Sequence, residues 1–423
     1  MPILGIDDTD SSREMCTTYL TVEILRRTSL DLIGFPNLVR LNPNIPLKTR
    51  GNGAISLVLG RGSGEKKIVG MIDDEPVYSY GKYSEEKIDV DIMSIIEKFS
   101  PNDENTNPAL IIADNRKNPG FYWDAVREFV DYRKIMGNIS GPFSTVNGYV
   151  GLVGANAAIN WPAESATYEL ISYLDPSKWD GEHYVDEESA MYLEKNFDDL
   201  FDSYDFQNGY NAIRPSTKTP VLFGIRGIDP SLLAKHRITV RSEPYRSYII
   251  YKTNQGTDDH LVRRRIGESV LYQSSIIEGR VTDNPVRVRG GVLLFSVEDE
   301  SGSIKAVAME PTKGFRSLLS NLRRGDAVRI YGGITKPGFI NIEKIRVMRL
   351  STVKLISPPE CKKCGKRMES AGKNAGFRCR TCGARSSKGE EHVEERNISE
   401  GFYEVPITAR RHLARPLKLG EIK

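Results

Sequence analysis

Four cysteines near the C-terminal end constrain what this chain can fold into more than any other feature. They form two Cys-x-x-Cys pairs separated by 14 residues, at Cys361, Cys364, Cys379 and Cys382. Each pair can direct two thiolates toward one point, so the two pairs together can hold Zn²⁺ in a closed tetrahedral site. Such a site has no open position for a substrate. We therefore predict a structural zinc ribbon over residues 358–386.

The flanks of these cysteines are basic and include one aromatic side chain. The positions are Lys362, Lys363, Lys366, Arg367, Arg378, Arg380, Arg385 and the aromatic Phe377. Cationic side chains attract the RNA backbone, and an aromatic face can stack on an unpaired base. The composition therefore favours a ribbon that binds RNA, and a ribbon that binds protein is the alternative.

The formal charge of the chain is unevenly distributed along its length. Residues 1–234 carry a net charge of −13, whereas residues 235–350 carry +9 and residues 361–423 carry +7. A basic surface attracts phosphate backbones, and an acidic one can hold metal ions or a cationic substrate. The division indicates separate tasks for the two halves, with nucleic-acid binding in the C-terminal one. Mere drift in surface composition is the alternative.

The sequence also limits where the protein can act. Its longest apolar runs, such as residues 92–96 and 109–113, are far shorter than the roughly 20 residues that span a bilayer. The N-terminal segment turns acidic at once, which is untypical of a secretory signal peptide. The cysteines are too clustered for a secreted disulfide scaffold. We expect a cytoplasmic protein that does not contact a membrane.

Residues 275–350 alternate short β-rich runs with turns, and a helix is expected near residues 315–322. Five strands with one helix between the third and the fourth are the layout of an OB barrel. A generic small barrel is the alternative. The segment that follows the ribbon, residues 387–423, is polar and basic with few apolar side chains. It is expected to be flexible or to be ordered by contact.

The N-terminal half alternates strand-like and helical patterns. Residues 2–6 and 109–113 have the pattern of buried strands, and residues 16–30, 122–136 and 164–175 have helical spacing. This alternation predicts an α/β fold. Polar loops at the strand ends of such a domain are expected to converge on one pocket.

An acidic turn follows the first predicted strand and contains Asp7, Asp8 and Asp10. Three carboxylates this close repel one another unless they share a cation. Mg²⁺ prefers oxygen ligands and usually keeps phosphate partners, so the turn predicts a Mg²⁺–nucleotide site. A solvated turn with a helix-capping aspartate is the alternative. At the start of the next helix, the hydroxyls of Thr17 and Thr18 can either cap the helix or accept a phosphoryl group.

A second polar cluster comprises residues 40–43 and 48–53, and we call its last four residues, Arg50, Gly51, Asn52 and Gly53, the glycine cluster. Glycines on both sides of the asparagine allow a phosphate to approach the backbone closely, and the arginine supplies positive charge. The cluster does not match the GxxxxGK[ST] pattern of a P-loop. We predict that these four residues contact a bound nucleotide.

Two further arginines, Arg214 and Arg226, lie in glycine-containing turns of the N-terminal half. Either guanidinium can bind a phosphate through two parallel hydrogen bonds, and either can instead form a surface ion pair. Both are candidate nucleotide-binding residues.

Five segments of this chain occur in the order in which one enzyme family carries them. They are GIDDTDS (5–11), MCTTYL (15–20), RLNPNIPLKTRGNGA (40–54), TNPA (106–109) and YKTNQGTDDHL (251–261). Together with the expected barrel and ribbon, they resemble the archaeal tRNA 2-agmatinylcytidine synthetases over essentially the whole chain. The segments are long, so their combination is specific.

The resemblance implies a multidomain α+β protein whose parts follow one another in a defined order. They are a kinase-like α/β catalytic domain (1–137), a ferredoxin-like domain (138–262), an OB-fold (275–350), the zinc ribbon (358–386) and a basic C-terminal tail (387–423). In this arrangement the first domain performs the chemistry, and the OB-fold and ribbon grip tRNA.

The resemblance also implies an ATP-dependent ligase whose partners are agmatine and an isoleucine tRNA with the anticodon CAU. In this family agmatine replaces the C2 oxygen of the wobble cytidine, at position 34, so that the tRNA reads AUA. ATP is cleaved to AMP and diphosphate, and the cytidine passes through a phosphorylated intermediate. A dicationic substrate such as agmatine suits an acidic catalytic domain.

Individual residues receive roles from the same resemblance. Asp7, Asp8 and Asp10 would hold Mg²⁺ and the ATP phosphates, and Thr17 would be the phosphorylated threonine of the MCTT motif, with Thr18 as its neighbour. Two other classes of function remain as alternatives. A non-catalytic OB and zinc-ribbon protein would only bind nucleic acid. A small-molecule kinase or ligase would turn over ATP without responding to tRNA.

Overall fold

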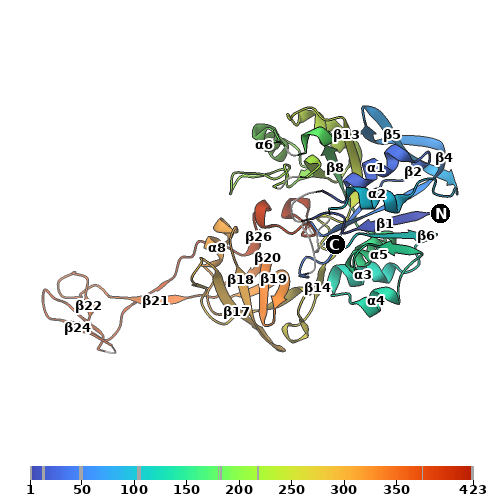
Figure 1. Cartoon of the computed structure of the whole chain (residues 1–423). Helices are drawn as coiled ribbons and strands as arrows, with labels where there is room; N and C mark the ends of the chain where they lie inside the picture. The colour runs from blue at the N-terminus through green and yellow to red at the C-terminus, as the bar shows by residue number, and fades with distance from the viewer. Residues whose placement is uncertain are drawn as a thin grey trace.

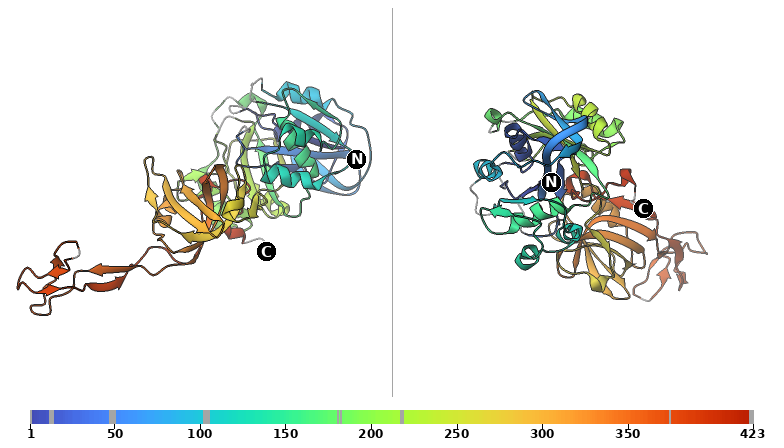
Figure 2. Two further views of the ribbon diagram at one scale, coloured as in Figure 1. Left: turned by 90° about the horizontal axis from the view of Figure 1, so that it is seen from below. Right: turned by 90° about the vertical axis from the view of Figure 1, so that its right-hand side faces the viewer.

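The computed structural model describes residues 2–11, 15–46, 51–101, 106–179, 181, 183–216, 219–373 and 375–420. Figure 1 shows a large α/β body, a β-barrel beside it and a thin arm that ends in a small ribbon. The view from below in Figure 2 shows that this arm projects away from the rest of the molecule. No helix in the described part of the chain is long and apolar enough to cross a membrane.

A single sheet of 11 strands runs through the whole α/β body. Its main path is β7-β6-β1-β4-β3-β13-β8-β12-β9, and β2 and β5 pair with β4 beside this path. The strands are β1 (Ile3–Asp7), β2 (Asp31–Ile33), β3 (Asn37–Arg40), β4 (Gly53–Ile72), β5 (Glu75–Ser84), β6 (Ala109–Ala113), β7 (Phe143–Thr145), β8 (Thr167–Tyr173), β9 (Leu200–Phe201), β12 (Val221–Gly227) and β13 (Ser247–Thr253).

Helices cover both faces of this sheet. They are α1 (Tyr19–Arg27), α2 (Ile92–Phe99), α3 (Pro119–Arg127), α4 (Tyr132–Met136), α5 (Val150–Asn160), α6 (Glu187–Asn196) and α7 (Pro230–His236). The body also contains the 3-10 helices η1 (Pro176–Lys178) and η2 (Arg237–Thr239) and the short hairpin of β10 (Tyr204–Asp205) with β11 (Tyr210–Asn211).

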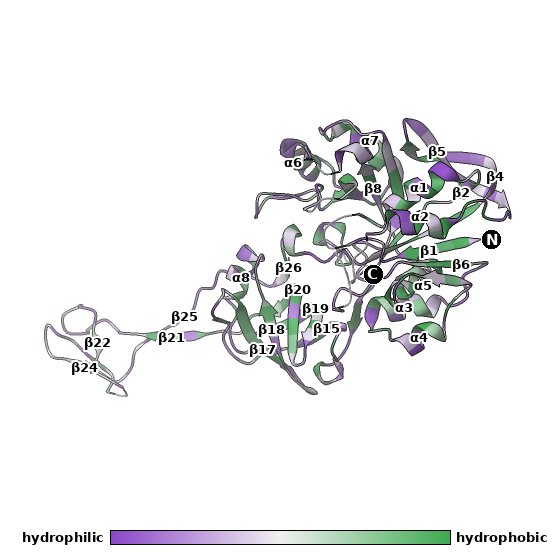
Figure 3. Cartoon of the chain, in the orientation of Figure 1, coloured by the Kyte–Doolittle hydropathy of each residue, from purple (hydrophilic) through white to green (hydrophobic). Residues whose placement is uncertain are grey.

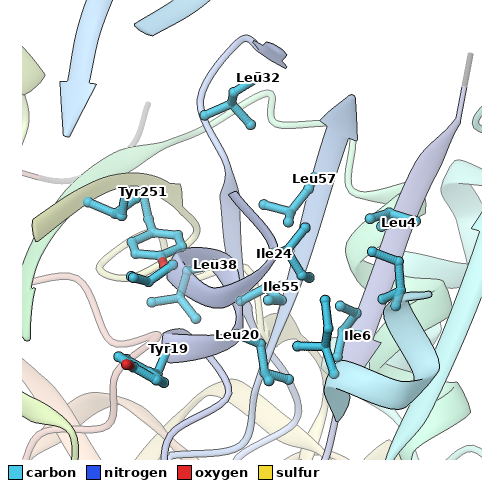
Figure 4. Close-up of a cluster of buried hydrophobic side chains, with 14 of the residues drawn as sticks. Leu4, Ile6, Tyr19, Leu20, Ile24, Leu32, Leu38, Ile55, Leu57 and Tyr251 are labelled. Atoms are coloured by element: carbon cyan, nitrogen blue, oxygen red, sulfur yellow. The ribbon is translucent and has the colours of Figure 1, made fainter. Parts of the chain in front are cut away.

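Strand β1 lies between β4 and β6, and it is hydrophobic along most of its length (Figure 3). Leu4 and Ile6 meet side chains of α1 on one face, as the close-up in Figure 4 shows. Because side chains alternate along a strand, Ile3, Gly5 and Asp7 point to the opposite face. Helix α5 covers that face so closely that a Cβ on Gly5 would strike its backbone. The strand therefore directs the first carboxylate of the acidic turn at α5.

The second half of the sheet has a hydrophobic core of its own. Leu170 of β8, Phe223 of β12 and Ile250 of β13 are buried in one cluster with residues of α6 and α7. Strand β13 also pairs with β3 and β4, so the sheet is continuous across the first two predicted domains. Helix α5, in the second predicted domain, packs against β1, β6 and α3 of the first. The positions of the domain boundaries therefore stay predictions.

Two predicted helices differ in the structure. The segment 122–136 forms the two helices α3 and α4, because Asp131 caps a new helix by accepting from the backbone N–H of Lys134. The helix predicted at 164–175 is wrong, since this segment forms the strand β8 between β12 and β13. Its aromatic and β-branched residues suit a strand. Burial on both faces removes the alternation of polar and apolar residues that would have revealed it.

The barrel closes because β15 pairs with both β17 and β19 and because β18 pairs with β20. Helix α8 lies between the third and fourth of its five main strands, which is the predicted OB layout. The elements are β14 (Leu261–Arg263), η3 (Ile266–Glu268), β15 (Ser274–Val281), β16 (Val286–Arg287), β17 (Leu293–Asp299), β18 (Gly302–Ala308), α8 (Lys313–Leu319), β19 (Ala327–Lys336) and β20 (Phe339–Arg349).

A two-stranded stalk of β21 (Lys354–Ser357) and β25 (Glu390–Val393) carries the ribbon. The strands of the ribbon are β22 (Glu369–Ser370), β23 (Phe377–Arg378) and β24 (Arg385–Ser386).

After the stalk the chain returns to the barrel, where β26 (Gly401–Glu404) pairs with β20. The segment beyond it contains η4 (Ile407–Ala409) and η5 (Leu417–Leu419) and contacts the α/β body. The tail was expected either to be flexible or to be ordered by contact. Its described residues are ordered by contact with the barrel and the α/β body.

Candidate active site

A cavity of about 470 Å³ opens between the two halves of the α/β body. Its walls are the acidic turn with the start of α1, the second half of the sheet, and the C-terminal segment after β26. A small cavity of about 40 Å³ is lined by Asp7, Asp8 and Asp10. Asp10, Asn52 and Gly53 line both cavities, so the acidic turn and the glycine cluster form a shared wall.

The acidic turn is held in place by the polar loop before β6. Asp8 has a left-handed backbone (φ 55°), and its carboxylate accepts from the backbone N–H of Asn107 at 3.0 Å. Thr106 donates its hydroxyl to the Asp10 carbonyl oxygen at 3.2 Å. Burial against α5 and the neighbouring Asp8 carboxylate raise the pKa of Asp7 well above its ordinary value. The turn therefore concentrates carboxylate oxygens, which are the ligands that a hard divalent cation prefers.

Both threonines at the start of α1 are buried and line the larger cavity. Thr9 donates its hydroxyl to the Thr17 hydroxyl oxygen at 3.1 Å, while the Cys16 thiol and the Thr18 hydroxyl lie 3.1 Å apart. Among the described residues, the Thr18 side chain makes no capping hydrogen bond to α1, although Thr18 is the N-cap residue. Its carbonyl oxygen accepts from the Tyr251 hydroxyl at 2.7 Å. Both threonines thus line the same cavity as Asp10.

The glycine cluster packs against Arg40, a residue of the same predicted polar cluster to which no nucleotide contact was assigned. The Arg40 guanidinium donates to the Gly51 carbonyl oxygen at 3.2 Å, and its Nη1 atom lies only 2.9 Å from a Cβ built on Gly53. Asn52 has a left-handed backbone (φ 46°) and donates its side-chain amide to the Asn42 carbonyl oxygen at 2.9 Å. These glycines therefore accommodate a buried guanidinium, and burial lowers the pKa of Arg40.

A buried carboxylate, Glu169 on β8, joins residues from distant parts of the chain. Arg226 donates to one oxygen at 3.0 Å, Arg40 lies 3.5 Å from the other oxygen, and Gln255 donates to that same oxygen. The Gln255 amide oxygen in turn lies 3.1 Å from Nδ1 of His412. This cluster forms part of the cavity wall. No sequence pattern indicated it, because Glu169 lies in the segment predicted as a helix.

The three predicted basic residues of the site have different outcomes. Arg226 lies in strand β12 instead of a turn, and its ion pair is with a buried carboxylate instead of a surface one. Arg214 is exposed on the wall of the larger cavity. Arg50 lies outside the described residues. Contacts of these arginines with a nucleotide stay predictions.

The four cysteines meet at one point in the ribbon, at the far end of the arm in Figure 1. All four Sγ atoms lie within 4.8 Å of one another, and three of the pairs are 3.4, 3.5 and 3.6 Å apart. Zn–S bonds of about 2.3 Å in a tetrahedron separate the sulfurs by about 3.8 Å, so the donor set fits Zn²⁺. Backbone N–H groups lower the pKa of the Cys361 and Cys379 thiols, whereas contacts with the neighbouring thiols raise the pKa of Cys364 and Cys382.

Helix α5 allows a test of how the acidic turn is positioned. A Cβ on Gly154 would overlap the Asp7 carboxylate, so we expect Gly154→Ala to displace Asp7 and to lower the free energy of unfolding by about 1–3 kcal/mol. Urea unfolding measures this loss. Gly81→Ala is the control, because a Cβ there meets nothing within 4 Å. Equal stabilities of the two variants would contradict the packing of Asp7 against α5.

Four family models match the chain one after another. They are the TiaS TCKD domain over residues 3–142, the TiaS FLD domain over 150–260, an OB-fold nucleic acid binding domain over 276–348 and the TiaS C-terminal zinc ribbon domain over 358–398. Their order agrees with the parts seen in the structure.

Two curated relatives match nearly the full length of the chain. Both are 2-agmatinylcytidine synthetases, named TiaS, that act on an isoleucine tRNA. The one from Archaeoglobus fulgidus is 38% identical over 98% of this chain and 96% of the relative. The one from Thermoplasma volcanium is 40% identical over 98% of this chain and 97% of the relative.

Solved structures agree with these relatives. The crystal structure of TiaS in complex with its isoleucine tRNA and ATP has a TM-score of 0.83 at 36% identity and covers 100% of this chain and 98% of that one. The crystal structure of TiaS in complex with the same kind of tRNA, AMPCPP and agmatine has a TM-score of 0.82 at 33% identity, with the same coverage of 100% and 98%.

Proposed function

This chain belongs to the TiaS family of isoleucine-tRNA 2-agmatinylcytidine synthetases, and on that premise we propose the reaction that its cavity serves. It is an ATP-dependent ligase that conjugates agmatine to C2 of the wobble cytidine, at position 34, of isoleucine tRNA with the anticodon CAU. The product, 2-agmatinylcytidine, lets the tRNA decode AUA. The observation that carries this conclusion is the full-length match to enzymes of this activity.

We assign the ATP phosphates to the acidic turn and the glycine cluster. Asp7, Asp8 and Asp10 offer only oxygen donors, and burial together with the neighbouring Asp8 and Asp10 carboxylates raises the pKa of Asp7, so a shared cation would stabilise its ionised form. These residues therefore fit Mg²⁺, which would supply charge neutralisation at the phosphates when bound. Asn52 and Gly53 would contact the same phosphates, because they line both cavities beside the carboxylates.

Thr17 is the proposed acceptor of a phosphoryl group. Its hydroxyl lines the larger cavity and is hydrogen-bonded to Thr9 of the acidic turn, which connects it to the assigned phosphate site. The Thr18 hydroxyl lies against the Cys16 thiol instead. Phosphorylation of the cytidine C2 oxygen converts a poor leaving group into a good one. The amine of agmatine then attacks C2, and the oxygen leaves with the phosphate.

The basic half of the chain would deliver the cytidine to this cavity. Residues 235–350 carry +9 and residues 361–423 carry +7, so the barrel and the ribbon can hold the phosphate backbone of the tRNA. The wobble base must leave the anticodon stack to enter a cavity, which costs little for a single-stranded base. Because its partner is a tRNA, we propose that the protein acts in the cytoplasm.

The deciding experiment incubates the protein with ATP, labelled agmatine and transcribed isoleucine tRNA carrying CAU. We expect label in the tRNA together with conversion of ATP to AMP and release of its two outer phosphates as orthophosphate, one of which carries the C2 oxygen of the cytidine. A tRNA with uridine at position 34 is the control and should remain unlabelled. If the CAU tRNA stays unlabelled, the proposal is wrong. Binding without ATP turnover would support a non-catalytic RNA-binding protein, and ATP turnover indifferent to tRNA would support a small-molecule kinase or ligase.

A further inference from the structure

The C-terminal segment beyond β26 forms a third wall of the larger cavity. Figure 1 shows it as the red ribbon between the barrel and the α/β body, and the views in Figure 2 agree with this placement. Ile407, Thr408, Arg410, Arg411 and His412 all line the cavity. The proposed reaction leaves these residues without a role.

One end of this wall is anchored to the second half of the α/β body. Thr408 donates its backbone N–H and its hydroxyl to the Asp205 carboxylate, each at 2.9 Å. The Arg410 guanidinium is almost buried, pairs with Asp202 and contacts Glu404 at 2.6 Å. These contacts attach the segment to strand β10 and to the turn between β9 and β10. They also neutralise the acidic groups at that end of the cavity.

The other end is anchored by backbone hydrogen bonds to the loop after β13. Gly256 donates to the His412 carbonyl oxygen at 2.9 Å, and Asp258 donates to the Leu413 carbonyl oxygen at 2.8 Å. The Arg415 backbone N–H donates to the Asp258 carboxylate at 2.7 Å. The segment is therefore a strap that is fixed on both sides of the cavity, so binding a ligand against it requires little additional ordering.

Arg411 lies between these anchors, and His412, whose backbone belongs to the second anchor, has its ring against Gln255 at the cavity wall. The structure shows one hydrogen bond from the Arg411 guanidinium to a described residue, the Pro43 carbonyl oxygen at 3.2 Å. A guanidinium carries five N–H donors, and its planar fork matches a phosphate. The carboxylates of Glu169 and Asp202 are already paired with arginines, and Glu343, which also interacts with Arg411, is paired with His260. The strap therefore contributes positive charge to a cavity whose lining also includes Asp10 of the acidic turn.

We infer that Arg411, with His412 beside it, binds a backbone phosphate of the single-stranded RNA segment that enters this cavity. The inference rests on the proposed function, because the polyanion is the substrate tRNA. A splayed nucleotide brings its own phosphate to the mouth of the cavity. An arginine on a preorganised strap would fix that phosphate and thereby position the base toward the carboxylates on the opposite wall.

The salt dependence of tRNA binding to the full chain tests this contact. Each phosphate contact in single-stranded nucleic acid adds about 0.7 to the slope of log affinity against log salt concentration. We expect Arg411→Gln to reduce the slope by about 0.7, His412→Gln to reduce it less, and Arg411→Lys to keep it. Lys418→Gln is the matched control, because Lys418 is a basic residue of the same tail that pairs with Glu194 outside the cavity lining.

The outcomes separate this inference from the proposed function. A slope for Arg411→Gln equal to that of Lys418→Gln would overturn the phosphate contact. A rise in the KM for ATP with an unchanged tRNA slope would also overturn it, since the arginine would then bind the nucleotide. Wild-type protein that never transfers agmatine would refute the proposed function, whatever the slopes. Thermal unfolding checks that the variants fold. If Arg411→Gln does not fold, the slope of Arg411→Lys still tests whether a positive charge at this position contacts a phosphate.

Discussion

Replacing Asp8 with asparagine should slow agmatine transfer to tRNA by about a hundredfold to a thousandfold and leave tRNA affinity unchanged. Asparagine has nearly the shape of aspartate, tolerates the left-handed backbone here and can still accept from the Asn107 N–H. It lacks the negative charge that would hold Mg²⁺ against the ATP phosphates. Phosphoryl transfer depends chiefly on such electrostatic positioning, and the loss of one preorganised group typically costs about 10²–10³ in rate.

Single-turnover transfer of labelled agmatine measures this rate, and filter binding measures the affinity for tRNA. Asp114→Asn is the matched control, since Asp114 follows β6 in the same part of the body but is exposed and does not line either cavity. It should retain the wild-type rate. If the Asp8→Asn protein transferred agmatine as fast as this control, the acidic turn would not take part in catalysis.

The acidic turn was predictable because its determinants are local. Apolar residues directly before Asp7 predict a strand, and the turn that follows must then lie at a strand end. The polar loop at Thr106 and Asn107 contacts the turn, in agreement with the expectation that polar loops at strand ends converge, and the structure adds the packing against helix α5 that fixes the turn. The cysteine spacing was equally informative, because two knuckles determine a tetrahedral site almost without reference to the rest of the chain.

The cluster around Glu169 was not predictable in the same way. Arg40, Glu169, Arg226, Gln255 and His412 come together only because β13 lies between β3 and β8 in one sheet and the C-terminal segment returns from the stalk. None of these connections leaves a pattern in the sequence. The strand that carries the carboxylate is buried on both faces, and its spacing was mistaken for that of a helix. Long-range topology, and not local propensity, therefore builds this wall.

We expect the ribbon to fold only when its metal is bound, and a second prediction, for the ligand Cys379, follows from this expectation. Its hydrophobic cluster contains only Cys361, Met368 and Cys379, with Phe377 and Ala384 packed against them. So small a core cannot offset the conformational entropy of the segment. Binding of structural Zn²⁺ to four such thiolates contributes about 10–16 kcal/mol, which makes metal binding and folding one event.

We therefore expect Cys379→Ser to lose zinc, to make residues 358–386 sensitive to protease and to weaken tRNA binding by about tenfold or more, because several basic residues of the ribbon lose their positions. Urea unfolding of the α/β body should not change, since among the described residues the stalk of β21 and β25 connects the ribbon to the barrel. Thr381→Ser is the control, because it alters the same knuckle and keeps all four ligands. A zinc-free protein with wild-type tRNA affinity would show that the ribbon does not grip RNA. A shifted unfolding midpoint of the body would show instead that the ribbon does not fold separately.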